Sequence, residues 1–455
     1  MLNLILTLGL SCISSANPYP DPRLVPLDTA STKHVPMQAA SLLSPRRLRT
    51  DALAVLRVRV DWASTTEKYT VGNVAREDSG TPALYARSKH LDPLGSYKGI
   101  LRDGVTGEAL AYDSIGTGME FRLLTRAISF RFPLVTTKVR FELQAENPTS
   151  GVLEKVVDVE IDPAQATHAA PARNAMESAP VVRQLLQATL QPKLVLNIYA
   201  DGYTSEREEA FFKDAAHAVQ TLLDRHFPMV EHFEVRAVFS PSAETLGRPR
   251  NLGLPVPERD SALGLYYPYW DNFGRWYNVV YPTREEKFRA AVGRIPYDYA
   301  LVLLDSDQYW GIGNYKELCA IPARDHHFDY LLTHEFGHFF GLNEEYEGGG
   351  KTELGFAPGI DEPWSQNITF LSDRRSATLK WKSFTRESTP LPTPDTLWDP
   401  ANPLYGAYAG GYGDSEPRHR SHKPGKSCVM ERAPDFCPIC RAALEQNIAR
   451  DLGVL

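Results

Sequence analysis

Short runs in which apolar and polar residues alternate dominate the chain from residue 51 to residue 162. These runs, separated by turn-forming residues, are residues 53–62, 68–74, 119–132, 137–144 and 154–162. A period of two places the apolar side chains on one face of a strand, so we expect an antiparallel β-sandwich here. It holds no evident catalytic constellation, and we interpret residues 51–162 as an accessory domain that positions substrate.

The pattern changes after a segment rich in alanine and proline. Continuous apolar runs, each suited to a buried strand, occur at residues 193–204, 234–242 and 299–307. Residues 206–227 repeat their apolar positions at helical spacing, and residues 376–384 predict one more strand before an amphipathic final helix. Strands alternating with helices indicate an α/β layer, so we expect a multidomain α+β protein. We assign residues 163–190 to a linker and residues 191–455 to a catalytic domain.

The first sixteen residues, MLNLILTLGLSCISSA, are apolar, too short to span a bilayer and end in small residues. We interpret residues 1–16 as a signal peptide that leaves a mature chain starting at Asn17. Residues 17–50 are rich in Pro, Ala and Ser and indicate a linker. Cys12 offers a lipoprotein alternative. No later stretch is apolar for long enough to be a transmembrane helix, so we expect a secreted, periplasmic or cell-surface protein.

One stretch, LLTHEFGHFFGLNEEY at residues 331–346, indicates a metal-binding helix followed by a sharp turn. His334 and His338 are four residues apart, so on a helix both imidazoles project from one face, where a single Zn²⁺ can join them. Glu335 lies beside the first histidine and can serve as a general base without binding the metal. Gly341 stands where the chain needs left-handed backbone geometry to turn back towards the metal.

The third ligand is open between two neighbouring carboxylates. In the pattern His-Glu-x-x-His-x-x-Gly-x-x-ligand the last position is usually a histidine, and here it is Glu344. A carboxylate binds Zn²⁺, and two histidines with one glutamate leave a fourth position open for water. Glu345 is the alternative, and the residue that does not bind metal is expected to orient a ligand histidine. Tyr346 can hydrogen-bond nearby or simply fill space.

Composition limits the partners. The net charge of −7 over 455 residues, without a basic stripe, argues against a nucleic-acid-binding protein. Once Cys12 leaves with the signal peptide, an even number of cysteines remains, which favours disulfides in an exported chain. These are Cys319, Cys428, Cys437 and Cys440. The Cys-x-x-Cys spacing of the last two also matches half a zinc ribbon or a redox pair, but no second such pair exists.

Taken together, these motifs resemble the IgA-peptidase family of zinc metallopeptidases. The resemblance rests on ADGYT, VRAVFSPS, HEFGH with GLNEEY, EPWSQNITF with KWK, and SCVM; in the sheet region it rests on HLDPLGSYKGILRDGVTGEALAYDS and SFRFP. It implies a metzincin-like catalytic domain with a methionine-containing turn beneath the zinc, for which Met430 is the candidate. That family typically has Asp-Glu-Tyr where this chain has Glu344, Glu345 and Tyr346, so the choice of third ligand stays open.

The function we expect is zinc-dependent hydrolysis of peptide bonds in a protein or peptide substrate. One catalytic Zn²⁺ would lower the pKa of its bound water towards about 7 and polarise the scissile carbonyl. Glu335 would take the proton of this water and deliver it to the departing amine. The loop Tyr309–Gly313 precedes the metal helix, and an edge strand there could align an extended peptide. Two alternatives are an inactive zinc-containing surface binding protein and a zinc hydrolase of a non-protein amide.

Overall fold

A computed structural model describes the chain from residue 53 to its end, with internal gaps. The described residues are 53–63, 66, 68–116, 126–147, 152–168, 179–246, 259–266, 280–282, 284–308, 311–346, 363–371, 379–411 and 421–455. The expected signal peptide, the expected linker at residues 17–50, and Tyr309 and Trp310 lie outside these ranges.

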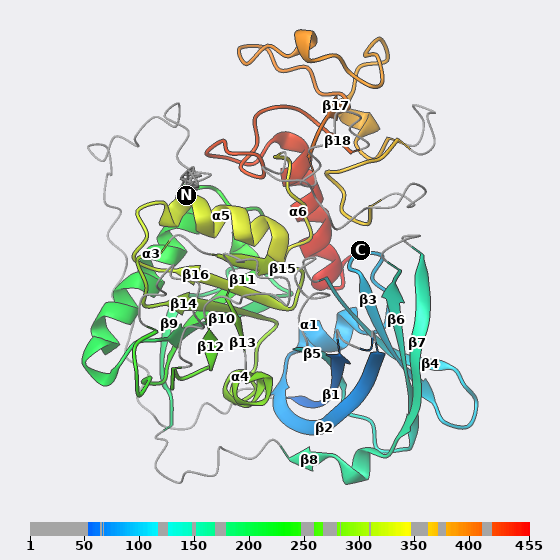
Figure 1. Cartoon of the computed structure of the whole chain (residues 1–455), viewed down its shortest axis with the longest axis vertical. Helices are drawn as coiled ribbons and strands as arrows, with labels where there is room; N and C mark the ends of the chain where they lie inside the picture. The colour runs from blue at the N-terminus through cyan, green and yellow to red at the C-terminus, as the bar shows by residue number, and fades with distance from the viewer. Residues whose placement is uncertain are drawn as a thin grey trace, which may run out of the picture.

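Two four-stranded sheets make up the first described part of the chain (Figure 1). The first sheet, in spatial order, contains β5 (Arg126–Pro133), β1 (Leu53–Ala63), β2 (Lys68–Gly80) and β8 (Thr167–His168). The second contains β4 (Ala109–Ile115), β3 (Tyr97–Asp103), β6 (Val139–Glu146) and β7 (Leu153–Ile161). All pairs are antiparallel except β2 with β8. A short helix, α1 (Pro82–Arg87), and the 3-10 turn η2 (Pro163–Gln165) complete this part.

Side chains from both sheets share one apolar core, which the alternation of the sequence explains. Leu56, Val58 and Val60 of β1 are fully buried, and Phe130 and Phe141 from the two sheets meet with ring centroids 5.8 Å apart. Successive strand residues point to opposite faces, so every second residue of β1 enters this core. The expected pattern of antiparallel sheets is present, with β3, β4 and α1 as additional elements that the alternation did not indicate.

A six-stranded mixed sheet forms the centre of the second part of the described chain. Its spatial order is β15 (Ile312–Asn314), β16 (Leu318–Pro322), β14 (Tyr299–Leu304), β10 (Leu194–Asp201), β11 (Phe233–Phe239) and β9 (Val181–Leu186). The four inner strands are parallel, while β9 and β15 run antiparallel at the two edges. Strands of a parallel sheet are covered on both faces, which agrees with the complete burial of β10, β11 and β14. β9 occupies part of the segment expected to be a linker.

Helices cover both faces of this sheet. α3 (Glu208–Asp224) and α5 (Phe328–Phe339) share one apolar core with it, and α4 (Glu285–Val292) packs into a separate core on the other face. The remaining elements are short: η3 (Ser205–Arg207), η4 (Val230–His232), β12 (Leu265–Tyr266) and β13 (Tyr281–Pro282). The sheet therefore carries α5, the helix with the histidine motif, on a filled apolar layer.

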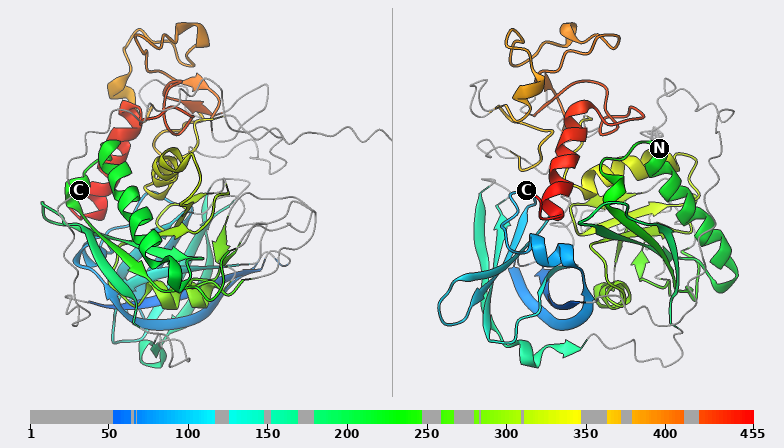
Figure 2. Two further views of the ribbon diagram at one scale, coloured as in Figure 1. Left: turned by 90° about the vertical axis from the view of Figure 1, so that its left-hand side faces the viewer. Right: turned by 180° about the vertical axis from the view of Figure 1, so that it is seen from behind.

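After α5 the described chain forms mostly loops and then the last helix. It contains η6 (Lys382–Phe384), η7 (Asp395–Leu397), β17 (Tyr408–Ala409), β18 (His422–Lys423) and α6 (Pro438–Asp451). The strand expected at residues 376–384 is wrong for its described part, which is a turn followed by η6. Lys380 donates to the carbonyls of Ser365 and Ile368, and Trp381 Nε1–H donates to Gly406 O at 2.6 Å. The alternating polar and apolar side chains of this segment therefore contact neighbouring loops and do not form the two faces of a strand. The C-terminal end of α6 reaches α1, as the rear view in Figure 2 shows.

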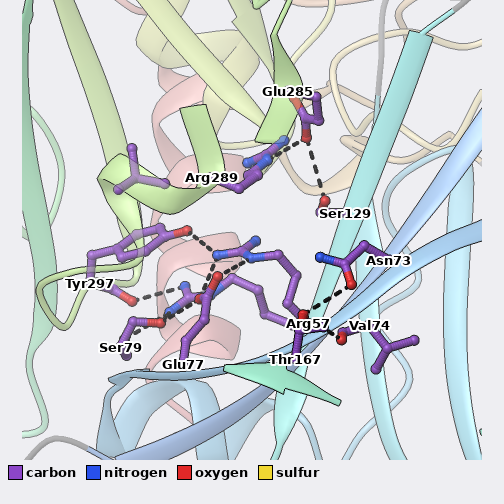
Figure 3. Close-up of polar contacts among 12 residues, drawn as sticks. Arg57, Asn73, Val74, Glu77, Ser79, Ser129, Thr167, Glu285, Arg289 and Tyr297 are labelled. Carbon is purple, nitrogen blue, oxygen red and sulfur yellow. Dashed lines mark hydrogen bonds and ion pairs between the residues drawn. The ribbon is translucent and has the colours of Figure 1, made fainter. Parts of the chain in front are cut away.

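Buried charges join the sandwich to the six-stranded sheet (Figure 3). Arg57 comes from the β1 face opposite the apolar core, and its Nε and Nη2 donate to Glu77 at 2.5 and 2.8 Å. Arg57 Nη2 also donates to the Tyr297 hydroxyl at 3.0 Å, just before β14. Arg131 of β5 adds donations to Tyr297 O at 3.0 Å and to Ser79 O at 2.8 Å. Because these groups are buried, the two parts are held together by fixed polar contacts.

Two further expectations concern cysteines and membranes. The expected disulfides are absent, since Cys319, Cys428, Cys437 and Cys440 are all free. Cys319 lies on β16 while the other three cysteines gather near the start of α6, so the expected pairing of all four is wrong.

Among the described residues, no helix is both long and apolar enough to cross a membrane.

Candidate metal centre

Helix α5 carries the histidine motif on a firmly packed support. Leu332, Phe336 and Phe339 are fully or almost fully buried in the core shared with the sheet. His334 is also buried, whereas Glu335 and His338 are half-buried. The apolar positions fix how α5 is rotated on the sheet, and this rotation brings the two histidines to the same side.

The two imidazoles face one another. His334 Nε2 and His338 Nε2 are 3.1 Å apart, and the ring planes are nearly perpendicular, at 86°. The other nitrogen of each ring donates to a carbonyl: His334 Nδ1 to Val429 O, and His338 Nδ1 to Leu342 O, both at 2.9 Å. These acceptors place the protons on Nδ1, so each Nε2 is left with a free lone pair.

This arrangement fits a bound cation. Burial, followed by the neighbouring His338, lowers the pKa of His334 to about 3, while the bond to Val429 opposes the change. A neutral His334 cannot donate from Nε2 as well, so two lone pairs meet across 3.1 Å. Two ligands about 2.05 Å from a tetrahedral Zn²⁺ are roughly 3.3 Å apart, close to the observed separation. The carbonyls of Val429 and Leu342 then orient the ligands, as outer partners of metal-binding histidines usually do.

The reversal after the helix occurs at Gly341, as the sequence predicts. Its φ is +96°, a left-handed value that favours glycine, and a Cβ there would lie 3.0 Å from Asn447 Nδ2. Leu342 N–H then donates to Gly337 O at 2.8 Å, which closes the end of the helix. The chain therefore turns back beside His338 rather than continuing away from it.

The two candidate carboxylates point in different directions. Glu344 Oε1 lies 3.9 Å from His338 Nε2, and its side chain is 34 % exposed. Glu345 is fully buried, and its Oε1 accepts from Cys440 Sγ at 2.8 Å and from Asn367 Nδ2 at 3.1 Å. Only Glu344 is on the side of the histidines. The ligand atoms of Glu344, His334 and His338 do not all lie within 4.8 Å of one another. The side chain of Glu344 would therefore have to rotate to bind a metal ion held by both histidines.

Met430 packs against α5, and the turn that contains it accepts hydrogen bonds from both His334 and Glu345. It is fully buried, and a Cβ on Gly337 would meet its Sδ at 2.3 Å. Its carbonyl accepts from Glu345 N–H at 2.8 Å. Tyr346 stacks on the imidazole of His334, with centroids 6.0 Å apart and an interplanar angle of 23°. Met430 and Tyr346 were predictable from the sequence, but the carbonyls of Val429 and Leu342 were not, because a backbone carbonyl leaves no signal in the sequence.

Glu335 projects from α5 towards the edge strand β15. A Cβ on Gly311 would lie 3.3 Å from Glu335 Oε1, and one on Gly313 would lie 2.2 Å from Glu335 O. The backbone of α5 thus excludes a side chain at Gly313, and a side chain at Gly311 would crowd the Glu335 carboxylate. Burial, and then the charge of Glu335, raise the pKa of Cys319 on β16. The carboxylate is therefore next to the outer strands of the sheet, beside the two histidines in the helix.

A groove elsewhere on the molecule does not belong to this site. It has a volume of about 630 Å³ and lies on the sandwich between residues 68–74 of β2 and residues 156–162 around β7. None of its lining residues comes from α5 or from the loop after it. The chemistry expected from the sequence is concentrated at α5 and not in this groove.

The chain is similar to one family of known proteins over part of its length. A family model described as IgA peptidase M64 matches residues 184–400. The matched range includes α5, Glu344 and Glu345, so the resemblance inferred from the sequence is confirmed there. The sandwich strands β1 to β8, Met430 and α6 lie outside it. No curated protein matches the chain.

Proposed function

Because residues 184–400 belong to the IgA peptidase M64 family, we propose that this protein is a secreted zinc-dependent endopeptidase whose catalytic domain is metzincin-like. The observation that carries the proposal is the pair of Nε2 atoms, 3.1 Å apart, with both Nδ1 atoms committed to backbone carbonyls. We assign His334, His338 and Glu344 as zinc ligands. Zinc bound there would supply Lewis-acid polarisation of the scissile carbonyl and a lowered pKa for water.

Glu335 is the general base in this proposal. Its carboxylate accepts a proton from the attacking water and passes it to the leaving amine nitrogen, which departs as a neutral amine. The helix gives Glu335 a fixed position next to His334, and the backbone of Gly313 holds its main chain from the other side. A base that is positioned in advance does not have to be ordered during the reaction.

Strand β15 suggests a polypeptide substrate. It is an edge strand, antiparallel to β16, and Gly311 just before it contacts the Glu335 side chain. An edge strand offers its outer backbone groups to an extended chain, and the missing side chains of the two glycines let β15 lie close to α5 and Glu335. We therefore assign β15 the role of aligning a peptide next to Glu335.

The position of Glu345 bears on the inactive alternative. A site closed by both Glu344 and Glu345 would leave no open position and would favour a purely structural zinc. Glu345 is instead fully buried against Cys440 and Asn367. A set of two histidines and one carboxylate keeps a fourth position open for water or substrate, as in catalytic zinc sites.

The test is a comparison of wild type with Glu335→Gln on a diverse peptide library, with products identified by mass spectrometry. The matched control is Glu445→Gln, which changes an exposed glutamate of α6. We expect cuts with wild type and control, and none with Glu335→Gln although its zinc content is unchanged. Cleavage by Glu335→Gln at the wild-type rate would refute the role of the base. Absence of cuts by fully zinc-loaded wild type would refute the peptidase proposal itself.

Secretion is tested separately. The apolar segment of residues 1–16 ends in Ser-Ser-Ala, which suits cleavage before Asn17. We expect protein recovered outside the producing cell to begin at Asn17. Retention in the cytoplasm with Met1 still present would exclude a signal peptide.

A further inference from the structure

A second group of metal-binding side chains lies apart from the two histidines. Glu345, Cys428, Cys437 and Cys440 each offer a ligand atom, and these atoms all lie within 4.8 Å of one another. Their exposed fractions are 0, 1, 4 and 0 % respectively. Three separate pieces of chain supply them: the loop after α5, the turn containing Met430, and the start of α6. Three thiols and a carboxylate are rarely brought together in a core without a partner of opposite charge.

Backbone N–H groups point at two of the three sulfur atoms. Cys437 N–H points at Cys428 Sγ, and Cys440 N–H at Cys437 Sγ, both at 3.4 Å. Cys437 is also the N-cap of α6, where unpaired backbone N–H groups favour negative charge. Donated N–H groups and a helix N-terminus are the features that stabilise a metal-bound sulfur.

The carboxylate of Glu345 is not fully satisfied by protein groups. Its Oε1 accepts from Cys440 and Asn367, but Oε2 is buried and has no hydrogen-bond partner among the described residues. A buried, ionised carboxylate oxygen without a partner costs free energy unless the group is protonated or a cation is present. The ammonium group of Lys423 donates to the Glu345 carbonyl at 2.7 Å and to Glu431, not to the Glu345 carboxylate, in the contacts of the described residues.

We propose that Glu345, Cys428, Cys437 and Cys440 bind a second, structural zinc ion. Four donors, three of them sulfur, match a closed tetrahedral site, in which Zn–S distances are about 2.3 Å and Zn–O distances about 2.0–2.2 Å. Soft thiolate ligands in a tetrahedral set select zinc over magnesium or calcium. Binding releases the thiol protons to solvent, so no oxidant or reductant is needed. The site has no open position and performs no chemistry on substrate.

This ion would hold the frame of the catalytic site. Glu345 follows Glu344 directly, and Cys428 precedes Val429, whose carbonyl accepts from His334. The second zinc thus joins the loop that carries the third catalytic ligand to the turn that orients the first. It also fixes both to α6.

The experiment measures zinc per chain in the full-length protein by elemental mass spectrometry. We expect about two zinc ions in wild type and about one in Cys437→Ser/Cys440→Ser. Cys319→Ser, which changes a buried cysteine outside the group, is the matched control and should keep two. His334→Ala/His338→Ala should keep one. Failure of this inference alone would appear as a single zinc that the histidine variant loses and the cysteine variant retains.

Because the cysteine variant can fail to fold, a second measurement uses only folded protein. Zinc X-ray absorption of His334→Ala/His338→Ala should give a sulfur-dominated shell at about 2.3 Å. A nitrogen- and oxygen-only shell would overturn the inference. So would a disulfide between any two of Cys428, Cys437 and Cys440, detected as missing thiols in the intact mass after alkylation. Loss of peptidase activity in Glu335→Gln leaves all of these readouts unchanged, so the two proposals fail independently.

Discussion

Replacing Gly337 by alanine tests how tightly the turn with Met430 packs against α5. A Cβ at position 337 would lie 2.3 Å from Met430 Sδ, 3.1 Å from Met430 Cε and 3.2 Å from Phe436 Cε1. Non-bonded carbon and sulfur atoms are comfortable at roughly 3.5–4 Å, so the sulfur has to move by about 1.5 Å. Met430 is fully buried, and its neighbours leave little room for that movement.

Two opposing effects set the expected magnitude. Alanine stabilises a helix interior by about 0.8–1 kcal/mol relative to glycine. Extra volume in a filled core costs about 1–3 kcal/mol. Since the clash is with a buried side chain, we expect overpacking to prevail, with a net loss of up to about 2 kcal/mol in unfolding free energy. A displaced turn also moves Val429 O away from His334, and losing such an outer partner typically weakens metal binding about 10–100-fold.

The assay combines calorimetric unfolding of zinc-loaded protein with competitive zinc titration against a chromogenic chelator. Gly337→Ala, Met430→Ala and the double variant form a thermodynamic cycle. Met430→Ala alone should cost about 2–5 kcal/mol, because it leaves a cavity. In the double variant the added methyl group occupies part of that cavity. The sum of the two single-variant losses in unfolding free energy should therefore exceed the loss of the double variant by about 0.5–3 kcal/mol. Strict additivity, or a Gly337→Ala protein stabilised by the full helix-propensity difference, would refute the contact.

The remaining predictions concern the contacts between the sandwich and the sheet. Glu77→Gln leaves Arg57 as a buried unpaired charge and should lower the unfolding free energy by about 3–5 kcal/mol, measured by denaturant titration. Glu160→Gln, which removes an exposed partner of Lys138, should leave the unfolding free energy nearly unchanged, and equal effects of the two variants would contradict this prediction. Asp92 provides a pH test. Burial alone would raise its pKa, but the Lys316 ammonium 2.7 Å away and the Tyr315 hydroxyl lower it to about 2. A depressed carboxyl pKa stabilises the fold above its unfolded value of about 3.9, so the advantage of wild type over Asp92→Asn should reach about 2 kcal/mol near neutral pH and decline as the pH falls from 4 to 2. A difference that does not depend on pH would exclude this linkage.

Local patterns predicted the elements whose apolar residues lie on one face. The alternation at residues 53–62 became β1, the run at residues 299–307 contains β14, and the histidine stretch became the end of α5. Gly341 was predictable for the same reason, because the need for positive φ is local. The strand predicted at residues 376–384 is wrong because Trp381, which alternates with lysines, packs against a loop and donates to Gly406 O. A period of two in the sequence cannot distinguish such a loop from a strand.

The choice between Glu344 and Glu345 was not predictable from sequence. The two are consecutive, so their side chains leave the backbone in different directions, and spacing from His338 does not decide which faces the two histidines. The path after Gly341 decides it: Asn367 and the Met430 carbonyl hold Glu345 on the inner side. Both contacts come from residues distant in the chain.

The group of cysteines was hidden for the same reason. A Cys-x-x-Cys pair normally needs a second pair nearby in sequence to be read as a zinc site. Here the other two ligands are single residues, Cys428 and Glu345, the latter inside the catalytic motif. The even cysteine count pointed to disulfides instead, and it misled because Cys319 belongs to the sheet.

The turn at residues 428–430 explains why a peptidase site would depend on a thiol-rich group in its core. Its three successive residues make three different contacts: Cys428 belongs to the cysteine group, Val429 O accepts from His334, and Met430 packs against Gly337. Within the turn, Cys428 O accepts from the N–H groups of Glu431, Arg432 and Ala433 at 2.8–2.9 Å, so backbone bonds fix its local shape. A zinc ion on the cysteine group would add a tie from this turn to α6 and to Glu345, and outer contacts of this kind keep a ligand imidazole in a defined direction. In the proposed site, the direction of the His334 imidazole would therefore depend on the turn and the cysteine group together, not on the histidine helix alone.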